Sequence, residues 1–108
     1  MSTWGDVERI ALRLAGARRG SAPDGAPTVV VGRHPFARLR LGDEGREAVQ
    51  FWSLDLDAGS ALAAEHDVFF RVDTFAVKAS VWAWLDRLDE QELAEILTDS
   101  WRARRGVR

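Results

Sequence analysis

Two segments with helical periodicity enclose a series of short segments in which apolar and polar residues alternate. Near each terminus, apolar residues recur three and four positions apart, which predicts amphipathic helices. The first helix is expected over residues 3–15, capped by Thr3, and the last over 89–101, opened by Asp89 with Glu92 three residues later. The two apolar stripes consist of Val7, Ile10, Ala11 and Leu14, and of Leu93, Ile96, Leu97, Ser100 and Trp101.

Five segments rich in β-branched and aromatic residues lie between these helices. They predict strands at 28–31, 36–41, 48–54, 68–72 and 80–85. Glycine and proline predict turns at 32–35 and 42–45 and a loop at 20–27, and a short helix is expected at 57–66. The order αβββαββα predicts an α+β fold, a five-stranded antiparallel sheet with helices packed on one face. A chain of 108 residues has room for one core, so residues 1–108 are expected to form a single domain.

Composition limits the compartment in which such a domain works. The chain has no cysteine, which excludes disulfides and thiolate chemistry and suits a reducing compartment. No basic segment followed by an apolar core begins the sequence, so no secretory signal is expected. No apolar run approaches the roughly 18 residues of a membrane span. These features predict a cytoplasmic protein, a monomer or a homodimer, that does not associate with membranes.

Charge is distributed unevenly along the chain, although the net charge is only -2. Residues 17–41 carry five arginines and one aspartate, and residues 100–108 carry four arginines and no acid, so each segment is +4. Residues 42–99 carry fourteen acids and four bases, a local charge of -10. Arginine is well suited to phosphates and to flat partners. A high arginine content also follows from nucleotide composition alone, which is the alternative explanation.

Catalytic and metal-binding motifs are missing from the sequence. The two histidines, His34 and His66, do not form a helical ligand pair, and no serine lies in a Gly-x-Ser-x-Gly elbow. The acids of Gly42-Asp-Glu-Gly45 would repel a phosphate, and Asp55 and Asp57 are explained by helix capping. We therefore expect no enzyme activity, no catalytic residue, no metal and no cofactor.

Strand alternation gathers an unusual set of side chains on one face of the predicted sheet. If the aliphatic positions face the helices, Phe36 falls on the opposite face with Arg38 and Arg40. The three tryptophans of this face, Trp52, Trp82 and Trp84, would form a large hydrophobic patch if they were exposed to solvent. The last helix, the loop at 20–27 or a second subunit is therefore expected to cover this face, or else a ligand binds there. The other residues assigned to this outer face are Gln50, Trp52, Phe69, Arg71, Trp82 and Trp84.

The ordered motifs resemble those of the MmcQ/YjbR family. They are Ile10-Ala-Leu-Arg-Leu-Ala-Gly16, Phe36-Ala-Arg-Leu39, and the C-terminal run Val81-Trp-Ala-Trp-Leu-Asp-Arg-Leu88 with Asp89-Glu-Gln-Glu-Leu-Ala-Glu-Ile-Leu97 and Ser100-Trp101. The resemblance implies a frataxin-like α+β fold and DNA binding through a double-wing arrangement. The His-Tyr pair that the family usually has after its fourth strand is missing, since residues 73–79 read Asp-Thr-Phe-Ala-Val-Lys-Ala.

Two functional hypotheses follow from these observations. In the first, DNA binds to a wing at residues 32–35 and to a C-terminal arginine arm. Its contact residues would be Arg33, His34, Arg38, Arg40, Arg102, Arg104 and Arg105. In the second, the chain binds or sequesters a flat aromatic small molecule, or docks a protein, on the outer face of the sheet. Its contact residues would be Arg38, Arg40, Trp52, Arg71, Trp82 and Trp84.

Overall fold

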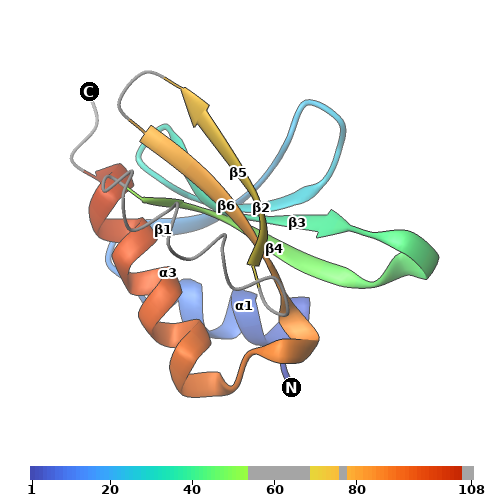
Figure 1. Ribbon diagram of the computed structural model, residues 1–108. Coiled ribbons are helices and arrows are strands. Elements are labelled where there is room, and N and C mark those ends of the chain that lie inside the picture. The colour runs from blue at the N-terminus through green and yellow to red at the C-terminus, as the bar shows by residue number, and fades with distance from the viewer. Residues whose placement is uncertain (54–68, 76–77, 106–108) are drawn as a thin grey trace.

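A computed structural model describes residues 1–53, 69–75 and 78–105. It is an α+β fold in which two helices pack against one face of an antiparallel sheet (Figure 1). The helices are α1 (Trp4–Ala11) and α3 (Glu90–Arg105), with short 3-10 turns η1 (Asp43–Gly45) and η2 (Leu85–Arg87). The strands are β1 (Ala17–Ser21), β2 (Pro27–Val31), β3 (His34–Leu41), β4 (Glu47–Ser53), β5 (Phe69–Phe75) and β6 (Lys78–Trp84).

The sheet has six strands, in the order β1-β2-β3-β4-β6-β5, rather than the five that the sequence predicts. The additional strand, β1, has the sequence Ala-Arg-Arg-Gly-Ser, which lacks β-branched residues and alternation. It becomes a strand because it pairs along the whole of β2, from Ala17 opposite Val31 to Ser21 opposite Pro27. The expected loop is therefore confined to the residues between β1 and β2. The short helix predicted at 57–66 lies outside the described residues.

Helix α1 begins as predicted but ends earlier. Thr3 accepts a hydrogen bond from the Asp6 backbone, and the Asp6 carboxylate accepts one in return from the Thr3 backbone, 2.9 Å away. The helix ends at Ala11 rather than Ala15, and the chain then turns toward β1 through Gly16, whose φ is 75°. The Trp101 indole stabilises this turn, since its Nε1 donates to the Ala15 carbonyl oxygen at 2.8 Å.

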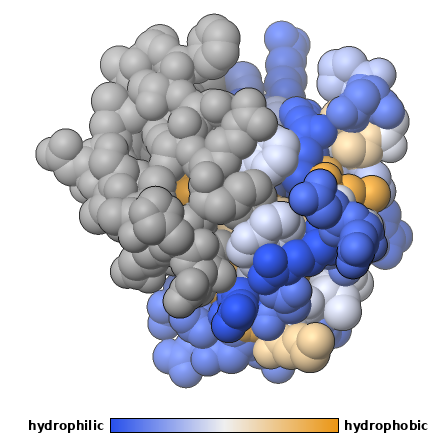
Figure 2. Space-filling model, turned by 45° about the vertical axis from the view of Figure 1, so that its right-hand side comes forward, coloured by the Kyte–Doolittle hydropathy of each residue, from blue (hydrophilic) through white to orange (hydrophobic). Residues whose placement is uncertain are grey.

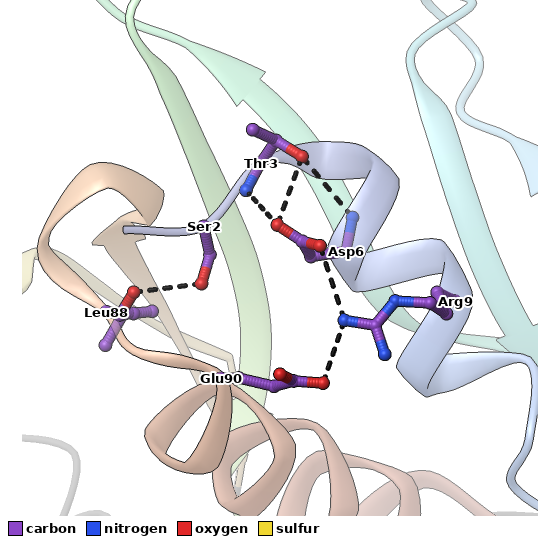
Figure 3. A network of polar contacts seen from close by, with 6 residues as sticks. All are labelled: Ser2, Thr3, Asp6, Arg9, Leu88 and Glu90. Atoms are coloured by element: carbon purple, nitrogen blue, oxygen red, sulfur yellow. Dashed lines mark hydrogen bonds and ion pairs between the residues drawn. The ribbon is translucent and has the colours of Figure 1, made fainter.

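A polar network joins the N-terminus to the start of α3 (Figure 3). Arg9 bridges the carboxylates of Asp6 and Glu90, at 3.3 and 2.9 Å. The buried Ser2 hydroxyl donates to the Leu88 carbonyl oxygen at 2.9 Å. These contacts fix α1 against the N-terminal end of α3, so the C-terminal end of α3 lies beside the opposite end of the sheet.

The core between helices and sheet is built from the predicted apolar stripes and strand faces. Its fully buried side chains include Val7, Leu93, Leu97, Val49 and Val81. One strand assignment was wrong, because Phe36 lies in this core and not on the outer face with Arg38. Val29 pairs with Ala37 and Val30 with Pro35, so Phe36 is the extra residue of a bulge and turns inward.

Neither helix of the described part of the chain is long and apolar enough to span a membrane.

Candidate functional site

The register of the sheet aligns the polar and aromatic residues of the outer face, which is the face opposite the helices. Arg38 on β3 pairs with Gln50 on β4, which pairs with Trp82 on β6. Trp82 in turn pairs with the backbone position of Arg71 on β5. Arg40, Ala48 and Trp84 form the neighbouring row, and Trp52 lies on the same face of β4, two residues beyond Gln50. The grouping expected from alternation is present in the backbone register, except for Phe36 and for Phe69, which pairs with Ala83 of the core-facing row rather than with the row of Trp82.

Each indole of this face lies beneath an arginine of the protein itself. The guanidinium carbon of Arg38 is 5.9 Å from the centre of the Trp52 ring. The corresponding distances are 5.6 Å for Arg40 and Trp82 and 4.0 Å for Arg46 and Trp84. Such distances allow cation–π attraction. We call these three contacts the Arg–Trp ladder and each contact one rung of it: Arg38–Trp52, Arg40–Trp82 and Arg46–Trp84.

Two arginines of the ladder are neutralised by carboxylates. Arg46 binds Asp86 through two parallel hydrogen bonds of 2.8 Å each, and this pairing holds the pKa of Asp86 below its ordinary value. Arg40 donates to the Gln50 amide oxygen and to the Asp24 carboxylate, both at 3.0 Å. The pKa of Asp24 is also lowered, first by the backbone N–H of Ala26 and then by Arg40. These two rungs therefore carry little net charge.

The third rung differs, because Arg38 has no carboxylate partner in the described part of the chain. Its Nε donates to the Thr28 hydroxyl at 3.2 Å. Arg104 from α3 approaches the same Trp52 ring, with its guanidinium carbon 5.0 Å from the ring centre, and its Nε donates to the Pro35 carbonyl oxygen at 3.0 Å. It has no described carboxylate partner either. Two half-buried guanidinium groups thus share one indole.

Burial and mutual repulsion both act on this arginine pair. The pKa of Arg38 is lowered, chiefly by burial and then by the nearby charge of Arg40, while the charge of Asp24 acts in the opposite direction. The pKa of Arg104 is lowered by burial and by the charge of Arg38. Partly buried charges in proteins are normally paired. The two guanidinium groups therefore form a site where an anion would be stabilised.

Other arginines surround this pair at the same end of the sheet. Arg18 donates to the Gly32 carbonyl oxygen at 2.6 Å, which places it against the β2–β3 turn that carries the exposed Arg33. Arg105 covers the Trp101 ring at 4.4 Å. Figure 1 shows the C-terminal end of α3 close to the β2–β3 turn. We call this region the basic end; it consists of Arg18, Arg33, Arg38, Arg104 and Arg105.

The residues predicted to bind DNA are only partly brought together. Arg33 and His34 lie at the β2–β3 turn, and Arg104 reaches that turn through Pro35. Arg102 is exposed near Asp99, at 3.9 Å, and does not contact the others. The last helix was one of three expected covers of the outer face, but it packs on the other side of the sheet.

Sequence reasoning missed Asp24 and Arg46, which lie in turns and reach across to the outer face. It also did not explain why position 42 is glycine. A Cβ added there would lie only 2.4 Å from a ring carbon of Trp84, so no larger residue fits. Glycine at this turn is the signal that a bulky side chain packs against the backbone. An open groove of about 440 Å³ adjoins the ladder; it is lined by Asp24, Gly25, Ala26, Pro27, Leu39, Arg40, Leu41 and Trp82.

On the side shown in Figure 2, hydrophilic residues dominate and the hydrophobic ones form small, separate groups. Within residues 1–53, 69–75 and 78–105, no group of three His, Cys, Asp or Glu side chains is arranged to bind a metal ion.

Comparisons of the chain with protein-family models, with curated proteins and with solved structures find no match.

The Arg46–Asp86 pair leads to a prediction about pH. Because the pKa of Asp86 is lowered in the folded protein, its charged form stabilises the fold above the ordinary carboxyl pKa, and this contribution is lost as the pH falls through the lowered value. Asp86→Asn should therefore lose less stability than the wild type when the pH is reduced below about 4. Thermal melts over a pH series measure this, and Arg46→Met should give the same flattening. Parallel profiles for wild type and variants would contradict the assignment.

Proposed function

We propose that this chain binds nucleic acid through its basic end, with backbone phosphates bound by Arg38 and Arg104. The observation that carries the proposal is the guanidinium pair on the Trp52 ring, which contacts no carboxylate among the described residues. A phosphate oxygen pair matches the planar, forked donors of arginine and would remove the repulsion between the two groups. Backbone phosphates are also the main source of affinity in nucleic-acid complexes.

The separation of charge within the molecule supports one orientation of the partner. Helix α3 has Glu90 and Glu92 in its first turn and arginines in its last turn, about 15–23 Å apart along the helix axis. Asp43 and Glu44 lie beyond the far end of β3, and Asp86 lies beside the start of α3. A polyanion is therefore attracted to the basic end and repelled by the other end.

The resemblance to the MmcQ/YjbR family implies DNA binding through a double-wing arrangement, and this proposal likewise has a nucleic acid as the partner. The wing at residues 32–35 belongs to the basic end, and Arg104 links it to the C-terminal arginine segment. Binding of a small aromatic molecule alone is less well supported, because such a ligand would leave the guanidinium groups of Arg38 and Arg104 without an anion.

Salt dependence tests the proposal. In Arg38→Ala/Arg104→Ala, two phosphate contacts are lost, so the slope of log affinity against log salt should become shallower by about two units. Fluorescence anisotropy with a labelled oligonucleotide, between about 50 and 200 mM salt, measures the slope.

The control is Arg9→Ala/Arg87→Ala, which removes the same charge from the acidic end. Arg9 contacts Asp6 and Glu90, and Arg87 is exposed in η2. This variant should keep the wild-type slope. Equal slopes for all three proteins, or no binding by the wild type, would refute the proposed interface.

A further inference from the structure

The Arg–Trp ladder presents flat surfaces that are spaced too widely for the bases of a duplex. Trp52 and Trp82 occupy diagonal positions on β4 and β6, because Trp82 pairs with Gln50 and not with Trp52. Diagonal neighbours lie about 7–8 Å apart, and Trp82 and Trp84 are separated by two strand residues, about 7 Å. Stacked bases in a duplex rise by about 3.4 Å. Only an unstacked single strand can place successive bases along this line.

Base faces are also hidden inside a duplex, which offers its partner only base edges and phosphates. Indoles and guanidinium planes are the surfaces on which proteins stack the bases of single strands. In the ladder both kinds of plane occur together, and Trp82 and Trp84 are only half-buried. The neutral rungs, where Arg40 and Arg46 are paired with acids, offer stacking without additional charge.

We infer that the nucleic acid bound by this chain is single-stranded, with its bases stacked along the Arg–Trp ladder and its phosphates directed to Arg38 and Arg104. This inference rests on the proposed function and specifies its substrate class. Charge complementarity directs the phosphates to the Trp52 rung, because its two arginines contact no carboxylate among residues 1–53, 69–75 and 78–105.

The groove beside Trp82 gives one base a place to bind. Its volume of about 440 Å³ lies within the range of small-molecule sites. The β1–β2 loop forms its wall, and the Asp24 carboxylate, whose side chain is 61% exposed, can accept a hydrogen bond from an exocyclic amino group. Gly25 in this loop has a φ of 87°, and a Cβ added there would meet no described atom within 4 Å.

The test compares one labelled sequence as a single strand and as a duplex, by anisotropy and by quenching of tryptophan fluorescence. The single strand should bind at least about tenfold more tightly and quench more strongly, since stacking contributes to its affinity alone. Trp82→Leu should weaken single-strand binding by about five- to a hundredfold, the change expected for loss of one stacked base. Duplex binding should change little.

Two controls make the result specific. Trp82→Phe keeps an aromatic plane and should retain most of the affinity, which also covers the case in which Trp82→Leu folds poorly. Trp4→Phe alters a buried core indole and should change neither affinity nor strand preference. If duplex and single strand bind equally and Trp82→Phe and Trp82→Leu behave like wild type, the inference fails while the proposed function stands. If neither form binds, both fail.

Discussion

Phe36→Ala should lower the free energy of unfolding by about 3–5 kcal/mol. The Phe36 side chain has no exposed surface and lies in the core between the helices and the sheet. Truncation would leave a cavity that the surrounding strands and α3 cannot fill without moving. Equilibrium unfolding in urea, followed by circular dichroism, measures the change. The size of this loss would be unexpected for a residue that alternation places beside Arg38 on the outer face.

Leu41→Ala is the matched control on the same strand. Alternation assigns Leu41 to the core face with Ala37 and Leu39, yet its side chain is 63% exposed. Its truncation should change the free energy of unfolding by no more than about 0.5–1 kcal/mol. If the two variants lose similar amounts of stability, the bulge at Phe36 does not turn the side chain inward as described.

These two residues illustrate how far the sequence predicts the fold. The segments that became β2, β3, β4 and β6 were predictable because β-branched and aromatic residues alternate with polar ones between glycine-rich turns. Alternation holds only while the strand is regular, and the bulge between Val29 and Val30 of the partner strand shifts it by one residue. Strand β1 could not be predicted, since its formation depends on pairing with β2 and not on its own side chains.

The candidate site was predictable in its backbone positions but not in its charge balance. The sequence indicates that Arg38, Arg40, Trp52, Trp82 and Trp84 share a face, because strand residues two apart point the same way. It cannot indicate which arginines are neutralised. The partners of the ladder are distant in sequence, 16 residues for Asp24 with Arg40 and 40 for Asp86 with Arg46. Those pairings form only when the turns are in place.

The contact between α3 and the Trp52 rung could not be predicted from the sequence either. Ser100 belongs to the apolar stripe of the last helix by spacing, but its hydroxyl is fully buried and makes two hydrogen bonds to the sheet. It donates to the Phe36 carbonyl oxygen at 2.6 Å and accepts from the Trp52 backbone N–H at 2.9 Å. One side chain thus connects the bulge of β3, the strand that carries Trp52, and the helix that carries Arg104.

Ser100→Ala should therefore destabilise the protein by about 2–4 kcal/mol, since two backbone groups lose their hydrogen-bond partner and each unsatisfied buried group costs about 1–3 kcal/mol. Thr98→Ala is the control, because the bond that the Thr98 hydroxyl makes within the described residues is to the Ala94 carbonyl oxygen of its own helix, so it should contribute much less. Urea unfolding measures both. Similar small losses would show that the link to β3 and β4 is not important for stability. Because Ser100 also sets the distance between α3 and Trp52, its replacement should reduce nucleic-acid affinity even under conditions where the variant is fully folded.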